Sequence, residues 1–232
     1  AVEQWIDLST GINPVPYPVA GLMPSDWATL PDQAAQDALI NAARDFWSVP
    51  DGAAILAAPG ASALIAQLPM LAPTGRVNIQ TPTYNEHAAA FDAQGWEIAD
   101  ADPATARVLV HPNNPDGRWW QGSDITGPLT VIDESFCDIA PDATLIKHAN
   151  QPGVVVLKSF GKFWGLAGLR LGFAIGDPAI IAKLTDLLGP WQVSGPALAI
   201  GAEALSDPAW AVETRARLTG DADRLDQLMT GH

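Results

Sequence analysis

The sequence is poor in several features, and each shortage excludes a class of protein. One cysteine, Cys137, stands among 232 residues, so no disulfide framework can form and a reducing compartment is expected. Basic residues are scarce: 12 Lys and Arg stand against 26 Asp and Glu, giving a formal net charge of -14. A surface of that sign repels nucleic acid and anionic lipid. An anionic substrate would therefore need lysine or arginine side chains placed at its own binding site.

Long apolar runs are also missing. The longest, such as 64–71 and 154–157, are far shorter than the roughly 20 residues that a membrane-spanning helix requires. The N-terminus has no basic region followed by an apolar run, so we expect no signal peptide. We therefore expect a cytoplasmic protein with no nucleic-acid or membrane partner.

What the sequence does contain is an alternation of strand and helix patterns. Short β-rich runs predict buried strands over 53–58, 76–80, 107–111, 130–133, 153–159 and 169–175. Helical spacing predicts helices over 34–47, 62–71, 85–94, 178–188, 197–205 and 210–228. Such alternation favours an α/β fold with a mostly parallel sheet covered on both faces, whose ligands bind beyond the carboxyl ends of the strands.

The two ends of the chain fit this pattern less well. A strand pattern at 5–8 begins almost at the first residue, and the last helices have no strands of their own to cover. We therefore expect both ends of the fold to be incomplete.

The most informative segment runs from Ser159 to Phe173. A strand leads into a turn of small residues, then Lys162, then a glycine-rich stretch and Arg170. A lysine after a strand is usually only a solvated side chain, but aromatic residues surround this one. A lysine among apolar groups gives up its proton more readily and becomes an amine nucleophile. Arg170 could bind a phosphate through two donors, and the glycine spacing is not that of a P-loop.

Further polar motifs follow the other predicted strands. Pro59–Ser62 could bind an anion through backbone N–H groups and a hydroxyl, although a capped turn is the simpler interpretation. Tyr84 either stacks on a planar ligand or fills the core. Asn113–Arg118 has the Asn-Pro and Asp-Gly pairs of a turn. Asp133 ends a buried strand, where a carboxylate is either a helix cap or a charge partner for a ligand.

In order and spacing these motifs resemble those of fold-type-I pyridoxal-phosphate enzymes, the class I and II aminotransferases, over about residues 5–205. They are most similar to the threonine-phosphate decarboxylases of cobalamin biosynthesis and to histidinol-phosphate aminotransferases. The resemblance implies a large domain at 15–195 with a mostly parallel seven-stranded sheet, as in aspartate aminotransferase. It also implies a small domain built from 1–14 and 196–232, incomplete at its C-terminal side, and a homodimer.

The resemblance further implies pyridoxal 5'-phosphate as the cofactor and assigns residues to its aldehyde and phosphate groups. Lys162 would bond the aldehyde carbon and act as the catalytic base and acid. The residues that would bind the phosphate group are Gly60, Ala61, Ser62, Ser159 and Arg170. Ala61 could contribute only its N–H.

Other residues would contact the cofactor ring. Tyr84 would stack on it, and Asn114 would donate to its 3-oxygen. Asp133 would keep the ring nitrogen protonated, so that the ring can accept electrons from the substrate. Many relatives have a tyrosine at the position of Phe136 that bonds the ring oxygen, and phenylalanine cannot form that bond. Many also have a tyrosine in place of Leu30 that reaches the partner subunit's cofactor phosphate, so that contact is not expected here.

The resemblance assigns the substrate contacts less completely. Gly11, Ile12 and Asn13 would contact the substrate from an N-terminal segment, together with Asn114. The family also supplies an arginine for the substrate carboxylate. Arg215 and Arg217 come too early in the sequence to match it, so this residue stays unassigned.

The details lean toward decarboxylation of O-phospho-threonine to the phosphate ester of aminopropanol. Asp116–Arg118, Phe136 and Gly11–Pro14 are all closer to the decarboxylase group. An aminotransferase acting on histidinol phosphate remains the alternative, because the same cofactor residues serve both reactions. A non-catalytic sensor would need a basic DNA-binding segment, which this acidic chain does not show. His87, His111 and His148 lack metal-ligand spacing, so no metal is expected.

Overall fold

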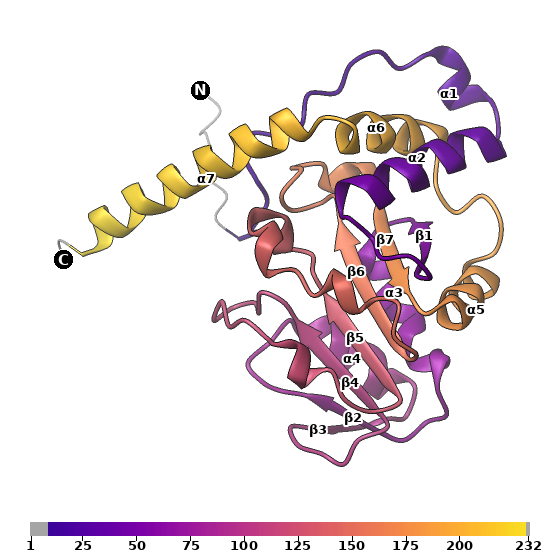
Figure 1. The fold of residues 1–232 in the computed structure, drawn as a ribbon, viewed down its shortest axis with the longest axis vertical. Helices are drawn as coiled ribbons and strands as arrows, with labels where there is room; N and C mark the ends of the chain where they lie inside the picture. Colours follow the sequence, from indigo (N-terminus) through magenta and orange to yellow (C-terminus); the bar gives the residue numbers. More distant parts are fainter. Residues whose placement is uncertain (1–8, 231–232) are drawn as a thin grey trace, which may run out of the picture.

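A seven-stranded sheet forms the centre of the fold in the computed structural model, which describes residues 9–230 (Figure 1). The strand order is β1-β7-β6-β5-β4-β2-β3. The strands are β1 (Ala54–Ala58), β2 (Arg76–Ile79), β3 (Glu97–Ala99), β4 (Ala106–Val110), β5 (Leu129–Asp133), β6 (Val154–Ser159) and β7 (Gly172–Gly176). β7 is antiparallel to both of its neighbours, and all other pairs are parallel. The predicted mostly parallel sheet is confirmed; the strand predicted at 5–8 lies outside the described residues.

Helices connect and cover the strands. They are α1 (Pro24–Ala28), α2 (Gln33–Phe46), α3 (Ala61–Gln67), α4 (Asn85–Ala93), α5 (Pro178–Leu188), α6 (Gly195–Leu205) and α7 (Pro208–Met229). Short 3-10 turns are η1 (Leu68–Leu71), η2 (Gly122–Asp124), η3 (Cys137–Ile139), η4 (Pro141–Ala143), η5 (Ile146–His148) and η6 (Ala167–Leu169). Side-chain oxygens of Asp32, Asp177, Ser194 and Asp207 accept backbone hydrogen bonds at the starts of α2, α5, α6 and α7, which explains where these helices begin.

Each face of the sheet carries its own hydrophobic layer. Val155 and Leu157 of β6 belong to the layer that includes residues of α3, α4 and α5. Val154 and Val156 belong to the layer that includes residues of α2 and α6. Successive residues of a strand point to opposite faces, so β6 supplies both layers in alternation. The same alternation decides where the polar residues at the strand ends point.

The last helix, α7, extends away from the sheet over most of its length (Figure 1). Its first turns are anchored: Trp210 stacks on Trp164 with ring centroids 5.2 Å apart, and Ala211 is buried. Within residues 9–230 no helix combines the length and apolar character needed to cross a membrane. The predicted domain boundary at residue 195 coincides with the start of α6, and the division into a large and a small domain stays a prediction.

Candidate active site

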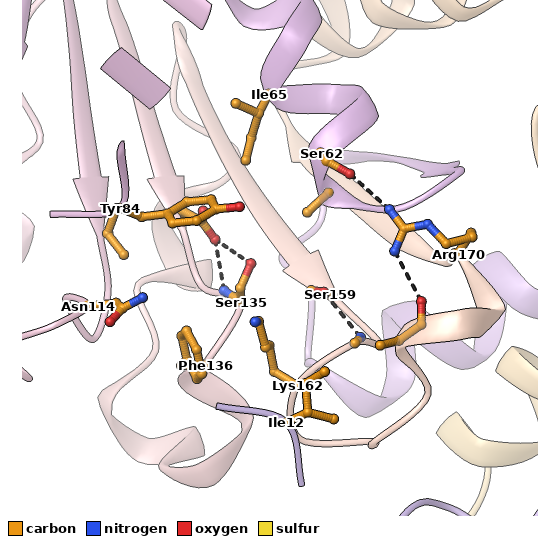
Figure 2. A pocket seen from close by; sticks show the side chains of 15 residues that line it. Ile12, Ser62, Ile65, Tyr84, Asn114, Ser135, Phe136, Ser159, Lys162 and Arg170 are labelled. Carbon is orange, nitrogen blue, oxygen red and sulfur yellow. Dashed lines mark hydrogen bonds between the residues drawn. The ribbon is translucent and has the colours of Figure 1, made fainter. Parts of the chain in front are cut away.

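A cavity of about 170 Å³ opens among the loops that follow the carboxyl ends of β4, β5 and β6 (Figure 2). It is lined by Ile12, Ala61, Ser62, Ile65, Tyr84, Val110, Asn114, Asp133, Ser135, Phe136, Ser159, Gly161, Lys162, Ala167 and Arg170. All the residues assigned to the cofactor from the sequence line this cavity, with the exception of Gly60. Residues from five separate motifs therefore meet in one place.

One end of the cavity is built to hold an anion. Arg170 Nη2 donates to Ser62 Oγ at 2.9 Å, and Nη1 donates to the carbonyl oxygen of Ala167 at 3.1 Å. Gly60 leaves room for this guanidinium, because a Cβ at that position would lie 2.5 Å from Arg170 Nη2. Ser159 Oγ accepts from Gly161 N at 3.2 Å, so its own hydrogen can donate into the cavity. A guanidinium and two hydroxyls are suitable partners for a phosphate group.

Another wall carries a buried carboxylate, Asp133, whose side chain is 3% exposed. Its Oδ2 lies 2.8 Å from His87 Nε2, and its Oδ1 accepts from the N and Oγ of Ser135 at 3.0 and 2.6 Å. Burial alone would raise the pKa of Asp133, but His87 and then Ser135 hold it below its ordinary value. Asp133 is therefore an anion at neutral pH. No helix begins at Asp133 or Glu134, so the helix-cap interpretation does not apply.

His87 and Ser135 are functional candidates that the sequence reasoning missed. His87 lies on α4, three residues after Tyr84, and their rings meet edge to face at 6.1 Å. The spacing places His87 about one turn along the helix that Tyr84 opens. The closeness of His87 to Tyr84 in the sequence could have indicated a place near the cofactor. Its partner, Asp133, belongs to β5, so their contact is visible only in the folded structure.

The Asn113–Arg118 turn contains two asparagines whose side-chain amides have different surroundings. Asn113 is buried; its Nδ2 donates to Pro82 O at 2.9 Å and to Asp116 Oδ1 at 2.7 Å, while its Oδ1 accepts from Thr83 Oγ1 at 2.6 Å. Asn114 instead lines the cavity (Figure 2). Asn113 thus shapes the loop, and Asn114 is the amide that a ligand can reach.

Lys162 stands in the turn that follows β6, and its side chain points into the cavity beside Phe136 (Figure 2). Its Nζ lies 5.2 Å from the centre of the Phe136 ring. In the part of the chain that the structure describes, no carboxylate lies within ion-pair distance of this Nζ. Lys162 is an amine in a cavity without a charge partner, as a nucleophile requires.

A second lysine nearby has the opposite surroundings. Lys158 is buried, with its Nζ 2.7 Å from Glu134 Oε2 and 3.3 Å from Asp138 Oδ1. Burial alone would lower the pKa of Lys158, but the two carboxylates hold it well above its ordinary value. Lys158 therefore stays protonated and cannot act as a nucleophile.

The same network fixes several loops around the site. Glu134 also accepts from Thr144 Oγ1 and Leu145 N, both at 2.6 Å. Asp138 accepts from the indole N–H groups of Trp47 and Trp164 at 2.9 and 3.0 Å. Sequence reasoning missed this network, although a lysine inside the apolar run of β6 indicates a buried acidic partner.

The N-terminal segment covers the turn of Lys162. Ile12 lines the main cavity, and Gly11, Ile12 and Asn13 line a second, mostly apolar hollow that also includes Lys162 and Phe136. Gly11 lies against Phe136: a Cβ at that position would be 3.0 Å from the ring. Asn13 is buried, and its Oδ1 already accepts from Arg217 Nη2 at 2.7 Å and Val15 N at 3.1 Å. A substrate contact by Asn13 stays a prediction.

A scan of family models matches residues 101–231 to "Aminotransferase class I and II". Threonine-phosphate decarboxylase of Sinorhizobium sp is 42% identical, over 85% of this chain and 65% of that protein. Threonine-phosphate decarboxylase of Pseudomonas aeruginosa is 36% identical, over 100% of this chain and 74% of that protein. Histidinol-phosphate aminotransferase of Desulfitobacterium hafniense is 27% identical, over 99% of this chain and 74% of that protein.

Solved structures show the same fold. The crystal structure of histidinol-phosphate aminotransferase from Sinorhizobium meliloti, in complex with pyridoxal-5'-phosphate, superposes with a TM-score of 0.75. The two sequences are 21% identical, and the match covers 87% of this chain and 63% of that one. At this identity the likeness concerns the fold alone.

Proposed function

Because the chain belongs to the class I and II aminotransferase family, we propose that it decarboxylates O-phospho-L-threonine to the phosphate ester of aminopropanol, a building block for cobalamin. The observation that carries this proposal is the similarity to two threonine-phosphate decarboxylases, at 42% identity over 85% of this chain and 36% over 100%. Histidinol-phosphate aminotransferase of Desulfitobacterium hafniense is 27% identical over 99% of the chain. The chain spans 65% and 74% of the lengths of those two decarboxylases. Phe136 and the Asp116–Arg118 turn support the same choice.

Enzymes of this family use pyridoxal 5'-phosphate, and the cavity has a group for each part of that molecule. Ser62, Ser159 and Arg170 would hold its phosphate, and Gly60 leaves room for the Arg170 guanidinium. Tyr84 would cover the ring. The ionised Asp133 would hold the proton on the ring nitrogen.

The 3-oxygen of the ring is the part with fewest partners. Phe136 has no hydroxyl to offer it, so the amide of Asn114 would be its donor from this chain. Gly11 and Ile12, together with Asn114, would contact the substrate on the side of the cavity that the N-terminal segment covers.

When bound, pyridoxal phosphate supplies an aldehyde carbon that bonds an amine and a ring that accepts electrons from the substrate Cα. Lys162 Nζ would hold the aldehyde carbon until the substrate amine replaces it. Freed in this way, Lys162 would hold or deliver a proton at Cα. Asp133, by keeping the ring nitrogen protonated, would favour the flow of electrons away from Cα.

The choice of bond separates the two candidate reactions. In the proposed decarboxylation the bond between Cα and the carboxylate breaks, carbon dioxide leaves, and Lys162 or water delivers a proton to Cα. In an aminotransferase Lys162 would instead remove the hydrogen from Cα. Lys162, Asp133 and Arg170 serve both outcomes equally, so the substrate contacts must decide.

We further propose that the protein is a cytoplasmic homodimer. One cysteine in an acidic chain favours a reducing compartment. Large apolar side chains are exposed along the segment before α2: Val15, Val19, Met23, Trp27 and Leu30. A row of exposed apolar residues of this kind is typical of a protein interface. Sedimentation would give the dimer mass, and an active monomer would contradict the proposal.

Two parallel incubations test the reaction. The protein with cofactor is given O-phospho-threonine in one, and histidinol phosphate with 2-oxoglutarate in the other. We expect carbon dioxide from the first and no glutamate from the second, with a Lys162→Ala variant inactive in both. Glutamate from the second without carbon dioxide from the first would make the enzyme an aminotransferase instead.

A further inference from the structure

Helix α7 is connected to the turn of Lys162 through one buried side chain, Asn13. The backbone N of Asn13 donates to the carbonyl oxygen of Lys162 at 3.1 Å, and its Nδ2 donates to that of Phe163 at 2.8 Å. On its other side, Asn13 Oδ1 accepts from Arg217 Nη2 of α7 at 2.7 Å. Asn13 therefore joins α7 to the backbone on both sides of the Lys162–Phe163 peptide bond.

The N-terminal segment packs closely against the end of the Lys162 turn, at Trp164 and Gly165. Tyr17 N donates to Trp164 O at 2.9 Å, and Gly165 N donates to Lys162 O at 3.1 Å. Gly165 has φ +69°, and a Cβ there would lie 2.7 Å from Pro16 Cα and 2.8 Å from Asn13 O. Glycine is thus required both by the backbone conformation and by the close approach. The position of the turn follows the position of Asn13.

Arg217 is the residue on α7 that holds Asn13 in place. Its bond to Asn13 Oδ1 is short and involves a charged donor to a buried acceptor, a class of hydrogen bond stronger than neutral ones. Its contact with Asp221 is longer, at 3.4 Å, and lies at the surface. Two residues earlier, Arg215 Nε donates to Asp138 O at 2.7 Å, in the loop that carries Phe136. The same helix therefore holds both sides of the space around Lys162.

We propose that Arg217 is a positioning residue for Lys162, acting through Asn13. With the backbone of the turn fixed, Lys162 Nζ moves between its two tasks, holding the aldehyde carbon and moving a proton at Cα, by side-chain rotation alone. Arg217 bonds to Asn13 and Asp221, and to none of the residues proposed to hold the cofactor phosphate. Its loss should therefore leave cofactor binding intact and lower the rate. This inference rests on the proposed function for its kinetic part only.

The test compares Arg217→Met and Asn13→Ala, singly and combined, with Arg217→Lys as the conservative change. Arg224→Met is the matched control, because Arg224 is an exposed arginine of the same helix whose nearest carboxylate oxygen, on Asp221, is 3.9 Å away. We expect Arg217→Met to lower kcat about tenfold with little change in KM or cofactor affinity, and Arg217→Lys to recover most of the loss. The double variant should be no slower than Asn13→Ala alone, because Asn13→Ala already removes the acceptor of the Arg217 bond.

Hydrogen exchange supplies a measurement that needs no substrate. Backbone amides in 11–17 and 160–166 should exchange about tenfold faster in Arg217→Met than in the control. Equal exchange in the two variants, or fully additive kinetic effects of Asn13 and Arg217, would overturn the proposal. If neither substrate is turned over, the proposed function fails while the exchange result still decides this inference. Should Arg217→Met not fold, Arg217→Gln against Arg224→Gln provides the same comparison.

Discussion

Lys158 and Lys162 are four residues apart in the sequence, one in β6 and the other in the turn that follows it, and their surroundings are opposite in character. Lys158 is 2% exposed and bonded to two carboxylates. Lys162 reaches into a cavity, where its Nζ lies 5.2 Å from the centre of the Phe136 ring. A buried amine whose charge is paired stays protonated and is chemically inert, and its removal would leave the two carboxylates buried without a cation. A nucleophilic amine must be left without such partners, and of these two lysines Lys162 meets that requirement.

The acids show the same division. Asp133 is the last residue of β5 and Glu134 is the residue after it, and their side chains have different partners. Asp133 faces the cavity and is held by His87 and Ser135. Glu134 faces Lys158. Asp133 is thus the acid that faces the cavity, whereas Glu134, through Lys158, Thr144 and Leu145, holds the surrounding loops in place.

The largest expected effect comes from breaking the buried network. Lys158→Met leaves Glu134 and Asp138 buried without a cation, which should lower the free energy of unfolding by about 3–5 kcal/mol. Urea unfolding of the cofactor-free protein measures it. The matched control is Lys162→Met, where no ion pair is lost and the change should stay below about 1 kcal/mol. Equal losses in the two variants would remove the distinction between the two lysines.

The second effect concerns Asp133. Asp133→Asn should lower turnover about 10²–10³-fold, because the ring nitrogen loses its charge partner, while cofactor still bonds to Lys162. Steady-state kinetics and the cofactor absorbance measure the two quantities. In the control, Glu134→Gln, Lys158 keeps Asp138 as partner, so turnover should fall less than tenfold. Near-normal turnover in Asp133→Asn would mean that this carboxylate only stabilises the loop.

The third effect tests the anion end of the cavity. Gly60→Ala should weaken cofactor binding about tenfold, since the new Cβ displaces Arg170. Gly95→Ala is the control, because Gly95 also has a positive φ, +76°, yet has nothing within 4 Å of its Cβ position. That variant should lose about 1 kcal/mol of stability from backbone strain alone and bind the cofactor normally. Equal cofactor affinities in the two variants would show that Arg170 does not bind the cofactor phosphate.

The smallest effect is on the pH dependence of stability. Burial alone would raise the pKa of Glu134, but Lys158 holds it below its ordinary value of 4.5. A lowered carboxyl pKa contributes stability that is present above the unfolded value and lost as pH falls through the folded one. The wild type should therefore lose stability as the pH falls below about 4.5. In Lys158→Met the loss should shrink or reverse, since burial then favours the protonated acid; an unchanged profile would contradict the coupling.

The sequence predicted the parts of the fold that carry strong local patterns. Six strands and six helices follow from apolar runs and helical spacing, and the structure has an element at each place. Two of them differ in extent: the helix predicted over 62–71 ends as α3 at Gln67 and gives way to the 3-10 turn η1, and the strand predicted from 169 begins at Gly172, after η6. β3 and α1 escaped because they are short and largely exposed, so no buried pattern marks them. The cavity residues were assigned from the resemblance of their motifs to those of pyridoxal-phosphate enzymes. Strand ends converge in a parallel sheet, which agrees with that assignment but does not give the individual roles.

What could not be predicted depends on contacts between distant segments. His87 looked like an isolated histidine until α4 placed it beside Asp133. Arg217 is separated from Asn13 by most of the chain, and nothing in either local pattern indicates the bond. Pairings of this kind follow from the packing of complete elements.

The contrast between the two lysines predicts that Lys162, and not Lys158, is the amine that bonds the cofactor. The most direct measurement is borohydride reduction of the cofactor-loaded protein, followed by peptide mass analysis over its four lysines: Lys147, Lys158, Lys162 and Lys183. We expect one cofactor adduct, on the peptide that contains Lys162, and its disappearance in Lys162→Ala. An adduct on Lys158, on Lys147 or on Lys183, or the absence of any adduct, would contradict it.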